Sequence, residues 1–134
     1  MENDSELRRS GGSASEPGAS LPFSRVVEEL RSILGARLVA YLGGVRETRT
    51  VRGWAEEDEA VESASADVVR RLRSAHAAAV LVGERFDRPT TSSWFQGMNP
   101  SLGDHAPAWV LLHRPAAEAE AAVIQAAKAF LADG

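Results

Sequence analysis

Apolar residues alternate at steps of four and three along residues 66–86, and no other pattern in the 134-residue chain constrains its fold as much. The positions in this series are Val68, Leu72, Ala75, Ala79, Val82 and Phe86. Because this spacing places every member on one side of an α-helix, it predicts a helix from Ala66 to about Arg85. His76 lies beside the stripe and widens it, so we expect the helix to be buried against more than one other helix.

The rest of the chain repeats the helical spacing and shows almost no alternating strand pattern. We predict further helices at residues 23–34, 36–42, 47–56, 90–95, 108–112 and 116–131. Gly35 ends the first of them, Gly43-Gly44 forms the turn after the second, and Asp87-Arg88-Pro89 breaks the long helix. The sequence therefore predicts an all-α fold, with an N-terminal three-helix unit of helix-turn-helix type followed by a small C-terminal helical bundle.

Changes in composition divide the chain into four predicted segments. These are a disordered tail at 1–20, the helix-turn-helix unit at 21–56, an acidic linker at 57–65 and a C-terminal helical domain at 66–134. The tail is rich in Ser, Gly and Glu and has too little apolar content to form a core. Ser63 or Ser65, at the end of the linker, is expected to cap the long helix.

Residue content argues against several classes of function. The chain has no cysteine, which excludes disulfides and thiolate chemistry. Its longest apolar run, Ala77–Val82, is too short to cross a bilayer, and its N-terminus lacks the pattern of a secretory signal, so we expect a cytoplasmic protein without membrane contact. The histidines have no metal-ligand spacing, and no nucleophile–base pair or phosphate loop is evident. We expect no metal, no cofactor and no catalytic residue.

A basic segment precedes the acidic linker. Residues 25–54 carry six arginines against three glutamates, although the whole chain has a net charge of −4. Within this segment, residues 38–54 read as two short helices joined by a glycine turn, which is the pattern of a helix-turn-helix. Val51 and Trp54 would hold the second helix to the core. An ordinary helical hairpin with a solvated arginine face is the alternative interpretation.

In a helix-turn-helix, the exposed side of the second helix would meet DNA. Arg46 and the helix N-terminus at Thr48 would contact phosphates and fix the register. Arg49, Thr50 and Arg52 would then reach base edges in the major groove. Acidic residues 56–59 follow directly and would repel phosphate.

The stretch Trp94–Pro107 combines two large aromatics, two prolines and two glycines in fourteen residues. Trp94 is expected to anchor the bundle with Phe95, and Pro107 to begin a helix at its first position. The polar residues between them could form an interface with a partner protein. These residues are Gln96, Asn99, Asp104 and His105. Physical reasoning from the sequence leaves open whether this stretch locks the core or presents a binding face.

The order and spacing of residues in this stretch resemble a known family. Trp94-Phe95, Asn99-Pro100, Leu102-Gly103, Pro107 and Leu111-Leu112, followed by Val123, Ala126-Ala127 and Phe130, are similar to the toxin-binding domain of the Xre/MbcA/ParS-like antitoxins. The segment from Val45 to Trp54 looks like the helix-turn-helix that these antitoxins carry. By position, the residues that match the family's signature are Trp94, Asn99, Leu102, Gly103 and Pro107.

The resemblance implies the antitoxin of a type II toxin–antitoxin system. Its partner would be a RES-domain toxin, a class that consumes or transfers from NAD, and the C-terminal domain would close the toxin's active-site cleft. The N-terminal domain would bind promoter DNA as a homodimer and repress the operon. The toxin-binding region predicted from the resemblance comprises seven residues, which are Trp94, Gln96, Asn99, Leu102, Gly103, Asp104 and Pro107. Within it, Gln96, Asn99 and Asp104 are the expected contacts, while the apolar anchors hold the shape. The alternative is a stand-alone dimeric helix-turn-helix transcriptional regulator.

Overall fold

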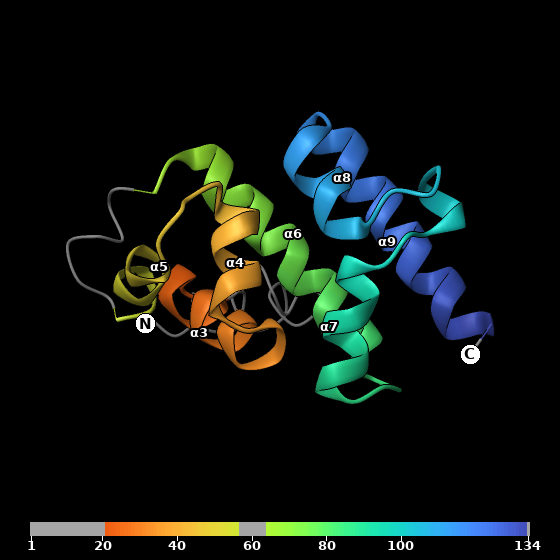
Figure 1. Ribbon diagram of the computed structural model, residues 1–134, viewed down its shortest axis with the longest axis horizontal. Helices are drawn as coiled ribbons and strands as arrows, with labels where there is room; N and C mark the ends of the chain where they lie inside the picture. The colour runs from red at the N-terminus through yellow and green to blue at the C-terminus, as the bar shows by residue number, and fades with distance from the viewer. Residues whose placement is uncertain (1–20, 57–63, 134) are drawn as a thin grey trace, which may run out of the picture.

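The computed structural model describes residues 21–56 and 64–133 (Figure 1). Over these residues the chain forms seven α-helices and one short 3₁₀ helix, with no β-strand, which confirms the all-α prediction. The elements are α3 (Phe23–Leu34), α4 (Ala36–Gly43), α5 (Thr48–Ala55), α6 (Ala66–Val82), α7 (Arg88–Gln96), η2 (Pro100–Leu102), α8 (Pro107–His113) and α9 (Ala116–Asp133). The predicted tail at 1–20 and residues 57–63 of the predicted linker lie outside the described residues.

Helix α6 begins where the sequence predicts and ends earlier. The Ser65 side chain accepts a hydrogen bond from the backbone N–H of Val68 at 3.2 Å and caps the first turn. The helix stops at Val82 and not at Arg85, because a series of tight turns follows Gly83. In these turns the backbone N–H of Arg85 donates to the Val82 carbonyl.

The segment Asp87-Arg88-Pro89 separates α6 from α7 and also forms the start of α7. The Asp87 carboxylate accepts the backbone N–H of Thr90 at 2.9 Å, so it caps α7. Hydrogen bonding from the side chain of Thr90, and next from its backbone N–H, lowers the pKa of Asp87. Pro89 lies in the first turn of α7, where the missing backbone N–H removes no hydrogen bond of the helix. The prediction that α7 begins near Thr90 was therefore two residues late.

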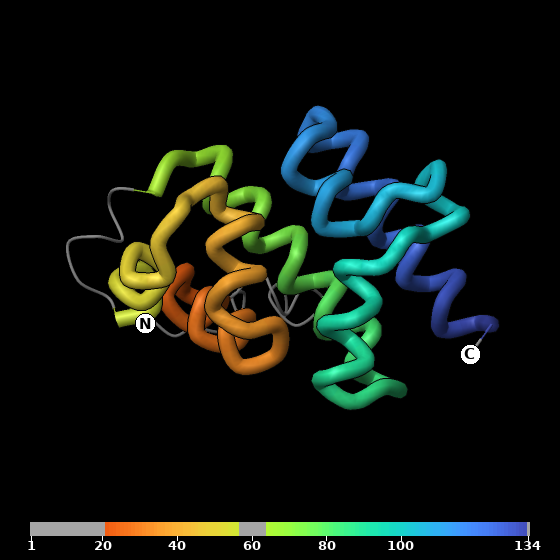
Figure 2. Tube along the Cα trace, in the orientation of Figure 1, coloured from red at the N-terminus to blue at the C-terminus, as the bar shows by residue number. Residues whose placement is uncertain are grey.

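Helix α6 passes between the helices of both halves (Figure 1, Figure 2). It packs against α3 and α4 on one side and against α9 and α8 on the other. Of the apolar stripe, Leu72, Ala75, Ala79 and Val82 are buried, and Val68 and Phe86 are partly buried. This confirms that the helix is buried against several neighbours. Burying a leucine such as Leu72 contributes roughly 1.5–3 kcal/mol.

A polar link joins α6 to α3 inside this core. His76 is 1% exposed, and its Nε2–H donates to Glu29 Oε1 at 2.7 Å. The hydrogen bond from His76 lowers the pKa of Glu29 more than any other cause, in opposition to the burial that raises it. The Nδ1 atom of His76 is buried and has no partner among the described residues. The sequence placed His76 at the buried face but gave no sign of its link to Glu29.

The two predicted domains are in close contact. Helices α3 and α4 pack against α6, α3 also packs against α7, and α4 against α8. The buried residues of both predicted domains belong to one hydrophobic cluster. The division at residues 57–65 stays a prediction, but the helices on either side of it share a continuous core. Among the described helices, none combines the length and the apolar character needed to cross a lipid bilayer.

Candidate interaction surface

The turn between α4 and α5 depends on two glycines with different roles. Gly44 has φ +71°, in the left-handed region, and closes α4 with a hydrogen bond from its N–H to the Tyr41 carbonyl at 3.0 Å. Gly43 is buried, and a Cβ atom there would lie 2.8 Å from Cζ3 of the Trp54 ring. The missing side chain of Gly43 therefore allows Trp54 to pack against the end of α4, and this contact places α5.

The residues predicted to contact DNA lie around α5. Val51 and Trp54 are buried, as predicted for the residues that hold this helix. Arg46, Thr48, Arg49 and Arg52 are exposed, and Thr50 is half-buried. Arg46, Thr48 and Arg49 line one groove, whereas Thr50 and Arg52 lie outside it. We call this the basic groove, and it is lined by Arg37, Ala40, Tyr41, Val45, Arg46, Glu47, Thr48 and Arg49.

The loop between α7 and α8 is folded on itself. The Asn99 side chain accepts the backbone N–H of Ser101 at 2.9 Å and caps η2, and the Asn99 carbonyl accepts the N–H of Asp104 at 2.9 Å. Gly103 and Asp104 have φ values of +65° and +68°, so two consecutive residues are in the left-handed region. The backbones of Asn99 and His105 form an isolated β-bridge. The side chain of Asn99 is thus engaged in shaping the loop.

The seven residues predicted to bind a toxin separate into two groups. Trp94, Leu102 and Pro107 are buried, and Asn99 is half-buried. Gln96, Gly103 and Asp104 are exposed.

Trp94 meets Phe95 edge-on, with the ring centroids 5.1 Å apart, and both are buried, as expected for anchors of the bundle. Of the exposed residues, only Gln96 lines a pocket described here. Its amide donates to the carbonyl and to the hydroxyl of Ser92, both at 3.1 Å.

A second groove lies between α4 and the pair α7 and α8. It is lined by Arg37, Leu38, Tyr41, Phe95, Gln96, Ala106, Ala108 and Trp109, and its volume is about 420 Å³. We call it the aromatic groove. Tyr41 is 38% exposed, and partial burial raises the pKa of its hydroxyl. Tyr41 and Arg37 also line the basic groove, so α4 joins the two grooves into one continuous surface.

Trp109 is held between two imidazole rings. His105 stacks on it with centroids 4.0 Å apart and an interplanar angle of 11°, and His113 stacks on it at 4.6 Å and 26°. The guanidinium of Arg114 lies 5.9 Å from the centroid of the indole. His113 Nδ1 is also 3.1 Å from the Trp109 carbonyl oxygen.

The stacking of Trp109 with His105 and His113 was not predicted from the sequence, although His105 was named among the polar residues of a possible interface. The available signal was the spacing of Trp109 and His113, because residues four apart on a helix lie on one side. His105 precedes this helix, which begins at Pro107.

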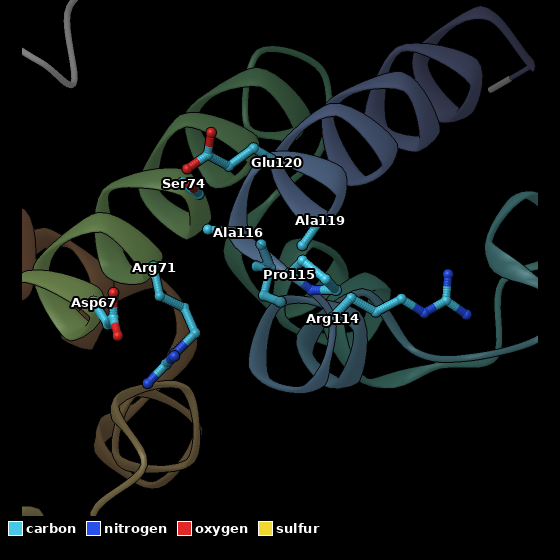
Figure 3. Close-up of a pocket in the computed structure, with 9 residues that line it drawn as sticks. Asp67, Arg71, Ser74, Arg114, Pro115, Ala116, Ala119 and Glu120 are labelled. Atoms are coloured by element: carbon cyan, nitrogen blue, oxygen red, sulfur yellow. The ribbon is translucent and has the colours of Figure 1, made fainter.

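A third pocket lies where α6, α8 and α9 meet (Figure 3). Its charged residues are engaged in contacts within the chain. Arg71 donates to the Leu42 carbonyl, and Glu120 pairs with Arg70, which lowers the pKa of Glu120. Arg114 extends away from the pocket in Figure 3 and pairs with Glu118 at 3.5 Å. We assign this pocket a role in holding the helices together.

Comparison with known proteins adds no evidence on the role of this surface. The chain matches no protein-family model, no curated protein and no solved structure. Within residues 21–56 and 64–133, no cluster of three His, Asp or Glu side chains is suited to hold a metal ion. The arguments for function therefore depend on the two grooves and on the residues that form them.

Proposed function

We propose that this protein is an antitoxin that binds a partner toxin through the aromatic groove. The observation that carries the proposal is the partly exposed Trp109, which stacks with His105 and His113 and lines a largely apolar groove together with Tyr41. Aromatic side chains in apolar pockets supply much of the binding energy at protein interfaces. A preorganised indole also loses little conformational entropy when a partner binds. The sequence resemblance supports a RES-domain toxin as the class of that partner.

The mechanism we propose is steric. The antitoxin would lie over the toxin's active-site cleft and exclude its substrate, which requires neither a cofactor nor a catalytic residue of its own. Buried signature residues such as Trp94 and Leu102 would maintain the loop and α8, while exposed groups on α4, α7 and α8 would make the contact. This distribution differs from the sequence-based expectation, because Asn99 is used within the loop.

Co-expression with the toxin encoded next to this gene tests the proposal. The wild-type protein should restore growth and form a complex that consumes no NAD. Trp109→Ala should weaken the complex, while Lys128→Ala should leave it unchanged, because Lys128 is an exposed residue of α9 that lines neither groove. Circular dichroism would verify that both variants remain helical. A purified pair that does not associate, or that associates and still consumes NAD, would disprove the proposed function.

A second proposed activity is DNA binding by a homodimer, and the basic groove favours it. Arg46 and Arg52 are exposed and have no ion-pair partner among the described residues, while Arg49 lies 3.8 Å from Glu47. Arg46 and Arg49 lie next to the N-terminus of α5, where exposed arginines suit phosphate contacts, while Arg52 lies in the last turn of this helix and outside the basic groove. A gel-shift assay with the upstream DNA over a salt series tests it. Arg49→Ala and Arg52→Ala should each weaken binding, and unchanged binding by both would contradict the proposal.

A further inference from the structure

We infer that the aromatic groove recognises an acidic segment of its partner, with an apolar side chain of that segment inserted between Tyr41 and Trp109. This inference rests on the proposed function, because it specifies the chemistry of the partner at the same surface. It follows from the charges around the groove, the apolar character of its lining and the rigidity of its aromatic residues.

The aromatic groove and the basic groove beside it carry an excess of positive charge. Arg37 lines it, is exposed and has no ion-pair partner among the described residues. The basic groove, which continues from it through Arg37 and Tyr41, adds Arg46 and Arg49 against a single carboxylate, Glu47. None of the residues that line the aromatic groove is acidic. A partner with carboxylates would therefore be attracted and oriented, whereas a basic one would be repelled.

The lining of the groove favours a peptide over a nucleic acid. Leu38, Phe95, Ala106 and Ala108 provide apolar surface between the aromatic rings. Removing such surface from water yields free energy only if the incoming group is itself apolar. The sugar–phosphate backbone of a duplex has no such group to insert. A volume of about 420 Å³ accommodates one or two aliphatic or aromatic side chains of a peptide.

The aromatic residues are fixed before a partner arrives. Stacking by His105 and His113 on both faces of the indole restricts Trp109 to one orientation. Tyr41 lies on α4, which packs against α3, α5, α6 and α8. Binding at such a site requires little reorganisation.

Two short synthetic peptides provide the test. Both carry the same central leucine and phenylalanine, flanked by glutamates in one and by lysines in the other. Binding is followed by NMR through the indole N–H signals of the three tryptophans. The Nε1 atoms of Trp54 and Trp94 are buried, so their signals serve as internal controls for the signal of Trp109. We expect the acidic peptide to shift the Trp109 signal, with an affinity that falls as salt rises, and the basic peptide to leave it unchanged.

Charge reversal at Arg37 makes the test specific. Arg37→Glu should weaken binding of the acidic peptide about tenfold or more and permit binding of the basic one. Arg37→Gln should lose part of the affinity, and Lys128→Glu, a charge reversal on an exposed residue that lines neither groove, should have no effect. Because Arg37 is exposed, these variants are expected to fold.

Several results would overturn the inference. The first two are equal binding of both peptides by the wild type and unchanged binding of the acidic peptide by Arg37→Glu. The third is a shift of the Trp109 signal that duplex DNA produces and the peptide does not. The fourth is a shift of this signal that depends only on protein concentration, which would identify a second copy of the chain as the occupant. A toxin that binds wild type and Arg37→Glu equally would contradict the acidic segment and leave the proposed function intact. A toxin that does not bind the wild type, together with an acidic peptide that does, would contradict the proposed function and leave the recognition chemistry of the groove intact.

Discussion

The basic groove and the aromatic groove share Arg37 and Tyr41 but are assembled differently. All residues that line the basic groove come from one continuous stretch, 37–49, which contains α4 and the turn into α5. The aromatic groove combines α4 with residues 95–96 and 106–109, which are far away in the sequence. The first surface can be read from a local pattern of arginines, whereas the second exists only when α4 packs against α8. A substitution can therefore disturb one groove with less effect on the other, and the following predictions use that difference.

Removing the main anchor of the α7–α8 region should have the largest effect. Trp94→Ala leaves a cavity beside Phe95 and Phe130 and should destabilise the protein by about 3–5 kcal/mol. The aromatic groove should lose its shape first, because Phe95 lines it. Denaturant unfolding and the peptide titration measure the two effects. Met98→Ala is the control, since Met98 is 81% exposed and should change stability by less than about 0.5 kcal/mol. Equal losses in both variants would contradict the assignment of Trp94 as an anchor.

A side chain added at Gly43 should disturb the basic groove more than the aromatic groove. In Gly43→Ala the added Cβ would meet the Trp54 ring at 2.8 Å, so α5 must move, at a cost of about 1–3 kcal/mol. We expect DNA binding to fall more than peptide binding. Gly97→Ala is the matched control, because its Cβ would meet only a carbonyl oxygen at 3.4 Å and its φ is −93°. An unchanged melting temperature in Gly43→Ala would show that the Trp54 contact does not fix α5.

Substitutions at Asn99 and at Asp104 should change stability to different extents, although both are polar residues of one loop. Asn99→Ala removes the cap of η2 and should cost about 1 kcal/mol, while Asn99→Asp keeps an oxygen acceptor and should retain stability. Asp104→Asn should change stability by less than about 0.5 kcal/mol. Thermal unfolding measures all three. Loss of toxin binding in Asn99→Asp without loss of stability would support the prediction that Asn99 contacts the toxin.

The smallest effect on stability is expected from the titration of Glu29 at low pH. The pKa of Glu29 is lowered in the folded protein, so its ionised form contributes stability that is fully present above the unfolded value of 4.5. That contribution, less than about 1 kcal/mol for a partly exposed carboxyl, is lost as the pH falls below 4.5 through the folded pKa. Glu29→Gln should flatten the stability profile in this range. Both grooves should respond alike, because Glu29 and His76 join α3 to α6 and line neither groove. A profile with the same slope in the variant would exclude this contribution.

The sequence predicted the helices well because their signals are local. The four-and-three spacing along α6, the glycine turn after α4 and the proline at the start of α8 each act within a few residues. The end of α6 was misplaced, since the turns after Gly83 carry no strong breaker. Residues that depend on distant packing were missed. Arg37 and Tyr41 form a groove with Trp109 only when α4 packs against α8, and His76 meets Glu29 across 47 positions of sequence.

The position of α6 has a consequence for any ligand of this protein. Because the helix is buried between α3 and α4 on one side and α8 and α9 on the other, neither half can unfold without exposing the apolar face that the other half covers. A ligand bound at either groove shifts the folding equilibrium of the whole chain by mass action. Partner occupancy and the lifetime of the protein against proteolysis are therefore linked. A bound chain would outlast a free one, and the balance between the two would set how much of the protein a cell retains.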